Sequence, residues 1–210
     1  MVAKAGRIGD KRRGPPRSQE DVLSAAARAF SRRGYLATTM RDVASELGVT
    51  PGALYSYFDS KESLFGAVAE RMRNRLLDAI EAPMPAGLSL EHEVELLLLR
   101  LFELTERYRG ELAAFIDAPA LGVADRPGAR MRGFELVRGR ITEWFCQPKR
   151  RAALTCDPAI AATTFTGMAI AVMRVRVMHD DSDPLVPLAP VVRALFVRGA
   201  TGDADGGGDL

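Results

Sequence analysis

The sequence predicts an all-α protein, and three observations support that prediction. No stretch shows the sustained two-residue alternation of β-branched or aromatic residues that is typical of a strand. Apolar residues recur instead at spacings of three and four, and Gly, Pro and Asp interrupt them where helices would end. With 210 residues, 47% of them hydrophobic and 27% charged, the chain has the make-up of a globular protein and not of a disordered or collagen-like one.

The first segment, residues 1–17, is expected to be a flexible basic arm, because glycines and prolines lie among its basic side chains. The charge of the whole chain is unevenly distributed. Residues 1–61 hold 11 Lys and Arg against 6 Asp and Glu, whereas residues 62–210 hold 18 against 21. The net charge of +2 is therefore the sum of +5 in residues 1–61 and −3 in residues 62–210. A basic N-terminal segment of this kind is typical of a chain that binds nucleic acid through that segment.

Four helix starts come after the arm in quick succession, and each has a suitable capping residue. A Ser or Thr at the N-cap accepts a hydrogen bond from the main chain of the first turn. Gly34 and Gly48 suit helix C-termini, and Pro51 suits a first helical position, where its missing N–H is not needed. The expected helices, with their caps, are 18–34, 39–48, 50–59 and 60–80. Residues 18–60 then form a helix-turn-helix unit, and the helix 61–80 links it to the rest of the chain.

The third of these helices has an unusual surface. Leu54 and Phe58, four residues apart, anchor one side of it and leave small residues and two tyrosines nearer solvent. Small side chains permit close approach to DNA, and tyrosine hydroxyls reach phosphates. The alternative is that Tyr55 and Tyr57 are ordinary packing residues and that the threonines serve only as caps.

Residues 18–80 resemble the DNA-binding domain of the tetracycline-repressor (TetR) family of bacterial transcriptional regulators. The resemblance rests on the strings AAARAF (25–30), GY (34–35), TTMRDVA (38–44), LGVT (47–50), LYSYF (54–58) and KESL (61–64). It covers under a third of the chain. Tyr57 departs from the family pattern, which often has His there, but it still offers a hydroxyl to a phosphate.

The resemblance implies a homodimer whose two recognition helices enter successive major grooves of a palindromic operator in double-stranded DNA. Carried over by position, the residues at the bases are Pro51, Gly52 and Ala53. Those at phosphates are Thr39, Thr50, Tyr55, Tyr57 and Lys61. Because the first three offer few hydrogen-bonding side chains, we expect little direct base readout. DNA shape and the arm residues Arg12 and Arg13 in a narrow minor groove would add specificity, unless the arm only supplies solvated charge.

The remainder, residues 61–200, is expected to be a helical ligand-binding and dimerisation bundle, followed by a disordered acidic tail, 201–210. Its expected helices are 90–108, 111–117 (stopped before Pro119), 131–145, 158–179 and 191–197. The resemblance implies that the last two helices form the dimer interface, with Phe165, Met168 and Val172 as knobs, although they could instead be internal core. The basic run 149–151 is expected on an exposed loop of the bundle, far from DNA.

A ligand pocket would lie inside this bundle, and its aromatic candidates are Phe102, Phe115, Phe134, Trp144 and Phe165. Each of them could equally be simple core. The sequence does not identify the small-molecule effector, although an apolar lining would favour a lipophilic one.

Several classes of protein and site are not expected. Two cysteines without a C-x-x-C pair and two histidines predict no metal site and reduced thiols, since a disulfide would need an oxidising compartment. No nucleophile–base set or phosphate-binding glycine loop is present, so we expect neither an enzyme nor a cofactor. The longest apolar stretch, 159–173, falls short of the roughly 20 residues of a membrane span, which favours a cytoplasmic protein.

The expected function is therefore that of a repressor released by an effector. The alternatives are a transcriptional activator of the same fold, or a ligand-binding or interaction protein without operator binding.

Overall fold

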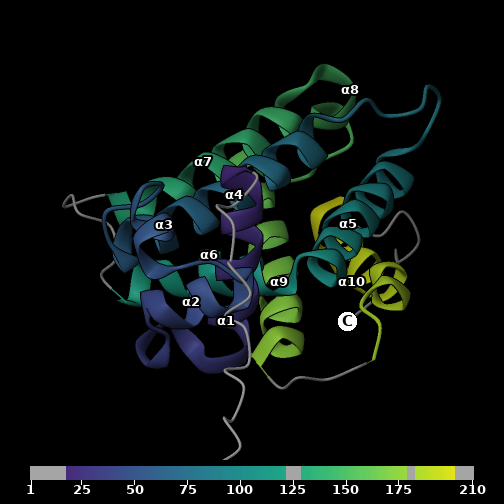
Figure 1. The fold of residues 1–210 in the computed structure, drawn as a ribbon. Helices are drawn as coiled ribbons and strands as arrows, with labels where there is room; N and C mark the ends of the chain where they lie inside the picture. Colours follow the sequence, from purple (N-terminus) through teal and green to yellow (C-terminus); the bar gives the residue numbers. More distant parts are fainter. Residues whose placement is uncertain (1–17, 122–128, 179–182, 202–210) are drawn as a thin grey trace, which may run out of the picture.

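The computed structural model describes residues 18–121, 129–178 and 183–201, and across those residues it contains helices and no strand, as the sequence predicts. Figure 1 shows their arrangement. The α-helices are α1 (Gln19–Ala37), α2 (Met40–Leu47), α3 (Pro51–Tyr55), α4 (Lys61–Glu81), α5 (Leu90–Arg107), α6 (Arg109–Leu121), α7 (Ala129–Cys146), α8 (Pro148–Ala152), α9 (Pro158–Met178) and α10 (Ala189–Thr201). A 3₁₀ turn, η1 (Val186–Leu188), precedes the last of them. The arm 1–17 and the tail 202–210 lie outside the described residues.

The predicted caps of the first four helices are confirmed. Each capping side chain accepts a hydrogen bond from the main-chain N–H three residues further on, and the caps are Ser18, Thr39, Thr50 and Ser60. At α2 the bond is reciprocal, because the Asp42 carboxylate also accepts from the Thr39 N–H at 2.9 Å. Gly34 (φ 76°) breaks the regular turn of α1, and Gly48 (φ 77°) ends α2 in the left-handed conformation that glycine adopts most easily.

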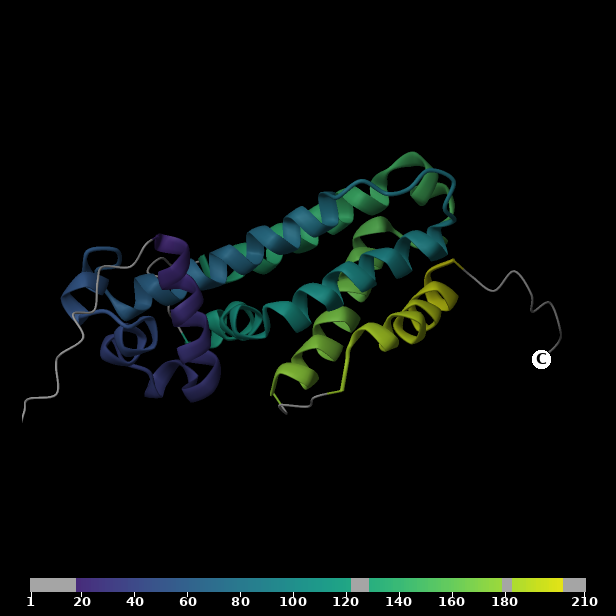
Figure 2. The same ribbon diagram turned by 45° about the vertical axis from the view of Figure 1, so that its right-hand side comes forward.

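The described residues form two hydrophobic cores, and α4 contributes to both. We call residues 18–60 the head and residues 61–201 the bundle. Leu64, Phe65 and Val68 of α4 pack with the apolar faces of α1, α2 and α3. Met72 and Ile80, further along the same helix, belong to the core of the bundle. Figure 2 shows α4 running from the head along the length of the bundle, so this single helix connects the two cores.

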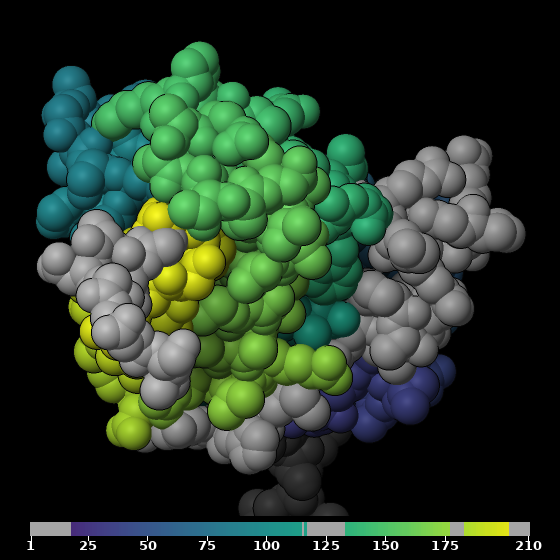
Figure 3. All heavy atoms as spheres, turned by 180° about the vertical axis from the view of Figure 1, so that it is seen from behind, coloured from purple at the N-terminus to yellow at the C-terminus, as the bar shows by residue number. Residues whose placement is uncertain are grey.

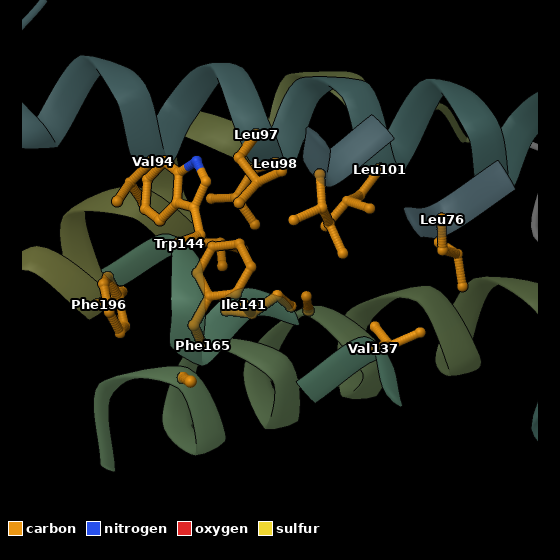
Figure 4. Packing of buried hydrophobic residues seen from close by; sticks show 14 of the residues in the cluster. Leu76, Val94, Leu97, Leu98, Leu101, Val137, Ile141, Trp144, Phe165 and Phe196 are labelled. Atoms are coloured by element: carbon orange, nitrogen blue, oxygen red, sulfur yellow. The ribbon is translucent and has the colours of Figure 1, made fainter. Parts of the chain in front are cut away.

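The bundle core lies between α4, α5, α7, α9 and α10. Figure 4 shows side chains of these helices pointing toward one another, among them Leu101, Ile141 and Phe165. Phe165 of α9 also stands edge-on to Phe145 and Phe196, with ring centroids 6.1 and 5.6 Å apart. Aromatic contacts of this kind join α7, α9 and α10 into one unit.

The sequence-based expectation that a helix would stop before Pro119 is wrong. Helix α6 continues to Leu121. A proline removes one hydrogen bond of the helix and its ring crowds the carbonyl one turn earlier, but Pro119 lies only two residues before the end of α6, so the disturbance is confined to the last turn.

The expectation of an exposed basic loop at 149–151 is also wrong. These residues form α8, and Arg150 is buried. Its guanidinium lies 3.9 Å from the Trp144 ring centre and donates a 2.6 Å hydrogen bond from Nε to buried Glu93. Burial opposes ionisation of Glu93, but hydrogen bonds from Lys149 and Arg150 outweigh it and lower the pKa of Glu93. Three adjacent basic residues are usually solvated. Glu93, the carboxylate that pairs with Arg150, is too distant in the sequence for a local pattern to predict that Arg150 is buried.

The run Pro158–Arg176 in α9 is, among the described residues, long and apolar enough by length and composition to cross a membrane. The expectation that this stretch is too short therefore does not hold on that criterion. Its buried positions, however, pack on α7 and α10 in the bundle core. Cys146 and Cys156 are both free thiols.

Candidate nucleic-acid interface and the bundle that carries it

Helix α3 is short and is held to the head by one buried side. Leu54 is fully buried, and Phe58 just beyond the helix is nearly so. Thr50, Pro51 and Gly52 are exposed, and Ala53 is half-buried. The N-terminus of α3 therefore presents small exposed side chains at the positive end of the helix, a surface that can approach a phosphate or a groove closely.

The two tyrosines of the predicted interface differ in exposure. Tyr55 is 50% exposed, as the sequence predicts. Tyr57 is half-buried and packs against the core of the head. Of the two rings, Tyr55 is thus the more available to an external partner.

Lys61 begins α4, and contacts with Tyr35 fix its position. Its ammonium donates to the Tyr35 carbonyl oxygen at 3.0 Å and lies 4.3 Å from the centre of the Tyr35 ring. The Tyr35 hydroxyl in turn donates to Glu62 at 2.8 Å. Burial and the neighbouring Glu62 carboxylate raise the pKa of Tyr35 to about 12. Lys61 therefore adds a positive charge in a fixed position to the N-terminus of α4.

Arginines of α1 fix α2 in place. Arg28 and Arg32 both bond to Glu46, and Arg33 bonds to Asp42. Hydrogen bonds from these arginines lower the pKa of Glu46. Hydrogen bonds with Thr39, and after them the charge of Arg33, lower the pKa of Asp42. The direction of α2, and of the turn into α3, is therefore set by α1. Arg12 and Arg13 lie outside the described residues.

A narrow apolar cavity lies inside the bundle. Its walls come from α4, α5, α6, α7 and α9, and two of the aromatic candidates, Phe134 and Phe165, are among them. Figure 4 shows the neighbouring wall residues Leu76, Val137 and Ile141. Its free volume is about 20 Å³, room for a single water molecule.

Sequence reasoning missed one polar group in this wall. Thr166 lines the cavity, and its hydroxyl oxygen is shielded from solvent and has no hydrogen-bond partner among the described residues. A threonine in an apolar helix carries no signal that would reveal this.

Two of the other aromatic candidates, Phe102 and Trp144, are not among the residues that line the cavity. Phe102 is fully buried in the core, and Trp144 borders a separate polar crevice beside Arg150. The side chain of Phe115 lies outside the described part of the chain.

The outer face of α9 and α10 carries exposed apolar side chains. These large exposed residues are Ile160, Val175, Val191 and Leu195. Figure 3 shows α9 running down this face with α10 beside it. Phe165 is 1% exposed and therefore lies on the inner side of α9, whereas Met168 and Val172 are half-buried against the core. The exposed positions 160, 164, 167, 171 and 175 have helical spacing, but α9 is apolar nearly all round, so the sequence alone does not show which of its sides faces outward.

Helix α6 connects the cavity to the head. Leu112 and Ile116 line the cavity, while the preceding residues contact α1 and α4. A Cβ atom added to Gly110 would lie 2.7 Å from the Ala27 carbonyl oxygen of α1, so only glycine permits this approach. The buried Glu111 carboxylate accepts hydrogen bonds from Arg71 and Arg75 of α4. Because of these contacts, a displacement of α6 at the cavity would also displace α1 and α4.

Comparison with known proteins relates the N-terminal part of the chain to one family. Residues 22–68 match the family model "Bacterial regulatory proteins, tetR family". The HTH-type transcriptional repressor KstR2 of Rhodococcus jostii (strain RHA1) is 31% identical over 97 residues, which are 46% of this chain and 48% of that protein. The chain thus spans about half the length of the curated relatives that it matches first.

Two solved structures show the fold over nearly the whole chain. A bacterial regulatory protein in the tetR family from Rhodococcus RHA1 is 25% identical, with 90% of this chain and 100% of that chain covered and a TM-score of 0.67. The transcriptional regulator FadR from Bacillus subtilis, in complex with stearoyl-CoA, is 22% identical, with 87% and 99% covered and a TM-score of 0.63. The head therefore carries the DNA-binding domain of the tetR family of bacterial regulatory proteins, a family that is not enzymatic, and the chain as a whole has the fold of solved structures from that family.

Proposed function

We propose that the protein is a dimeric operator-binding repressor that a lipophilic effector releases from DNA in the cytoplasm. The single observation that most strongly supports operator binding is the N-terminus of α3, where exposed Pro51 and Gly52 lie close to a half-exposed Tyr55. A protein that needed this surface only for stability would not expose a tyrosine there. The proposed division is the arm 1–17, the DNA-binding domain 18–60, the bundle 61–200 and the tail 201–210.

The proposed dimer is formed by the outer faces of α9 and α10. Ile160, Val191 and Leu195 are each more than half exposed, although they are large and apolar. Large apolar side chains exposed on two neighbouring helices indicate an interaction surface, and a second copy of the chain would cover them symmetrically. Two heads held at a fixed separation would then fit two half-sites of a palindrome.

The proposed effector has an apolar body that enters the cavity and a polar group that reaches Thr166. The cavity wall is apolar apart from that shielded hydroxyl, and the FadR relative named above holds an acyl-CoA. Because the free volume is so small, a ligand of that size must separate the helices, and α6 would carry the displacement to Gly110 and Glu111. A fatty-acyl ligand is therefore the first class to test.

Operator binding is tested by selecting duplexes from a random pool with the full chain, followed by anisotropy titrations at several salt concentrations. We expect enrichment of a palindrome and a steep loss of affinity with salt. Tyr55→Ala should weaken binding without lowering the thermal midpoint. Leu136→Ala, a matched loss of an exposed apolar side chain on α7, should not weaken it. No enriched sequence would refute operator binding.

The effector is tested on the selected complex with stearoyl-CoA and acetyl-CoA, which share a head group and differ in chain length. We expect stearoyl-CoA alone to release the duplex, and Thr166→Val to weaken that release. Release by both compounds, or by neither, would exclude an acyl chain as the recognised part.

A further inference from the structure

Arg41 differs from every other basic side chain of the described head and the start of α4. Arg28, Arg32 and Arg33 pair with carboxylates of α2, and Lys61 is held by Tyr35. Arg41 is exposed, and no hydrogen bond, ion pair or ring contact is found for it within the described residues. Five guanidinium N–H donors are therefore left without an acceptor in the part of the chain that the structure describes.

The position of Arg41 on α2 is not explained by helix stability. It occupies the first turn of α2, after the N-cap Thr39. A positive side chain in a first turn is disfavoured by the helix dipole, which prefers negative charge there. The neighbouring Asp42, which would suit that charge, is already engaged by Thr39 and Arg33. An arginine that is unfavourable for the helix and unpaired is better explained by an external acceptor.

The geometry of α2 places Arg41 on the side that leads to the recognition helix. Successive helical residues are rotated by about 100°. Met40, Val43 and Ala44 face the core, and Asp42 and Glu46 face the arginines of α1. The exposed residues Arg41 and Ser45 are four apart and share the remaining side, which continues through Gly48 into the turn before α3.

The base of this side chain is also fixed. The reciprocal capping bonds of Thr39 and Asp42 and the buried flanking residue Met40 hold the first turn of α2. A long side chain on a fixed turn beside α3 can reach a groove that α3 enters. Helix α3 itself cannot supply base-reading donors from Pro51, Gly52 or Ala53, because none of these side chains has a polar atom.

We propose that Arg41 is a specificity-determining residue that donates two hydrogen bonds to N7 and O6 of one guanine in each operator half-site. Arginine paired in this way with guanine is the commonest base-specific contact in the major groove. The inference depends on the operator binding proposed above, and it assigns the sequence reading mainly to α2, with α3 providing close approach and main-chain contacts.

The test is a set of anisotropy titrations on the duplex selected by the wild-type chain. Each base pair of the half-site is exchanged in turn, and guanine is also replaced by 7-deazaguanine, which lacks the N7 acceptor. For the wild type, we expect one guanine position at which either change weakens binding about tenfold or more. Arg41→Ala should lose a similar factor on the original duplex and become indifferent to the base at that position. Arg41→Lys should keep the salt dependence and retain only part of the discrimination, because an ammonium group can donate to N7 and O6 but lacks the planar fork of the guanidinium.

Arg33→Ala is the matched control, since it removes an arginine of the head that already has a protein partner. It should leave the base preference at every position unchanged. Circular dichroism should give the same thermal midpoint for Arg41→Ala as for the wild type. Equal loss of affinity by Arg41→Ala on all duplexes, with a shallower salt slope, would show a phosphate contact only and overturn the proposal, as would unchanged binding. If the wild type selects no duplex, operator binding itself fails, and the proposed reading fails with it.

Discussion

The head and the far end of the bundle both hold distant helices together with arginine–carboxylate pairs, but in different surroundings. In the head, the Arg28 and Glu46 side chains are 54% and 21% exposed and lie 3.0 Å apart. In the bundle, the Arg150 and Glu93 side chains are 8% and 4% exposed and lie 2.6 Å apart. The comparison indicates that the surface pairs adjust the orientation of α2 within the head, whereas loss of one partner of the buried pair would destabilise the bundle, because it would leave an uncompensated buried charge.

The two regions also differ in how they are connected. Helix α4 belongs to both cores, and α6 reaches from the cavity to α1. The head is therefore stable through local caps and a small core, while its position depends on contacts from the bundle. Four changes, given from the largest expected effect to the smallest, would break or sharpen this comparison.

The largest effect is expected from Glu93→Gln in the bundle. The variant leaves Arg150 buried without a charged partner, and breaking such a pair costs about 3–5 kcal/mol. Chemical denaturation measures the loss. A loss of less than about 1 kcal/mol in the free energy of unfolding would show that the buried pair contributes no more than the surface pairs, and it would contradict the proposed difference between head and bundle.

Gly110→Ala should destabilise the contact between α6 and α1. The added methyl group would meet the Ala27 carbonyl oxygen at 2.7 Å, and overpacking of this kind costs about 1–3 kcal/mol. Gly139→Ala on α7 is the matched control, because nothing lies within 4 Å of its Cβ position and alanine favours a helix by roughly 0.5–1 kcal/mol. Urea titrations of both variants measure the change in the free energy of unfolding. Equal behaviour would mean that the close approach is not a constraint.

A smaller effect is expected from removing one cap in each region. Thr39→Ala in the head and Ser89→Ala at the start of α5 each remove a side chain that accepts from the main chain of its first turn. Each should cost about 1 kcal/mol. Only Thr39→Ala should also weaken binding to the selected duplex. If Ser89→Ala weakened binding equally, the effect would follow from stability and not from contact.

The smallest effect is expected from Glu46→Gln, which removes an exposed partner of Arg28 and should cost less than about 1 kcal/mol. Because the pKa of Glu46 is lowered in the folded protein, its contribution is present above the ordinary glutamate pKa near 4 and is lost as pH falls through the lowered value. Thermal melts of both proteins between pH 3 and pH 7 should converge toward the acid end. A difference that grows on acidification would contradict this assignment.

The sequence predicts the head better than the bundle for a physical reason. Its helix starts depend on caps and glycines that act within three or four residues, so a local pattern is sufficient. The contacts of Arg150 with Glu93 and of Gly110 with Ala27 join residues far apart in the chain, and no local pattern reports them.

Helix α9 shows a second limit. It is apolar nearly all round, so its periodicity does not tell which side faces inward. Phe165, expected at the dimer interface, lies in the core, and Ile160 is exposed in its place. The unpartnered hydroxyl of Thr166 is equally invisible in the sequence, because only the packing around it leaves it without a partner among the described residues.

Amide hydrogen exchange of the full chain, with and without the selected duplex, tests most directly whether the head alone reads DNA. We expect duplex-dependent protection at the N-termini of α2, α3 and α4, with no direct protection of α8, where the second basic run 149–151 lies. Protection centred on Lys149 and Arg151, or none in α3, would contradict the assignment of DNA binding to the head.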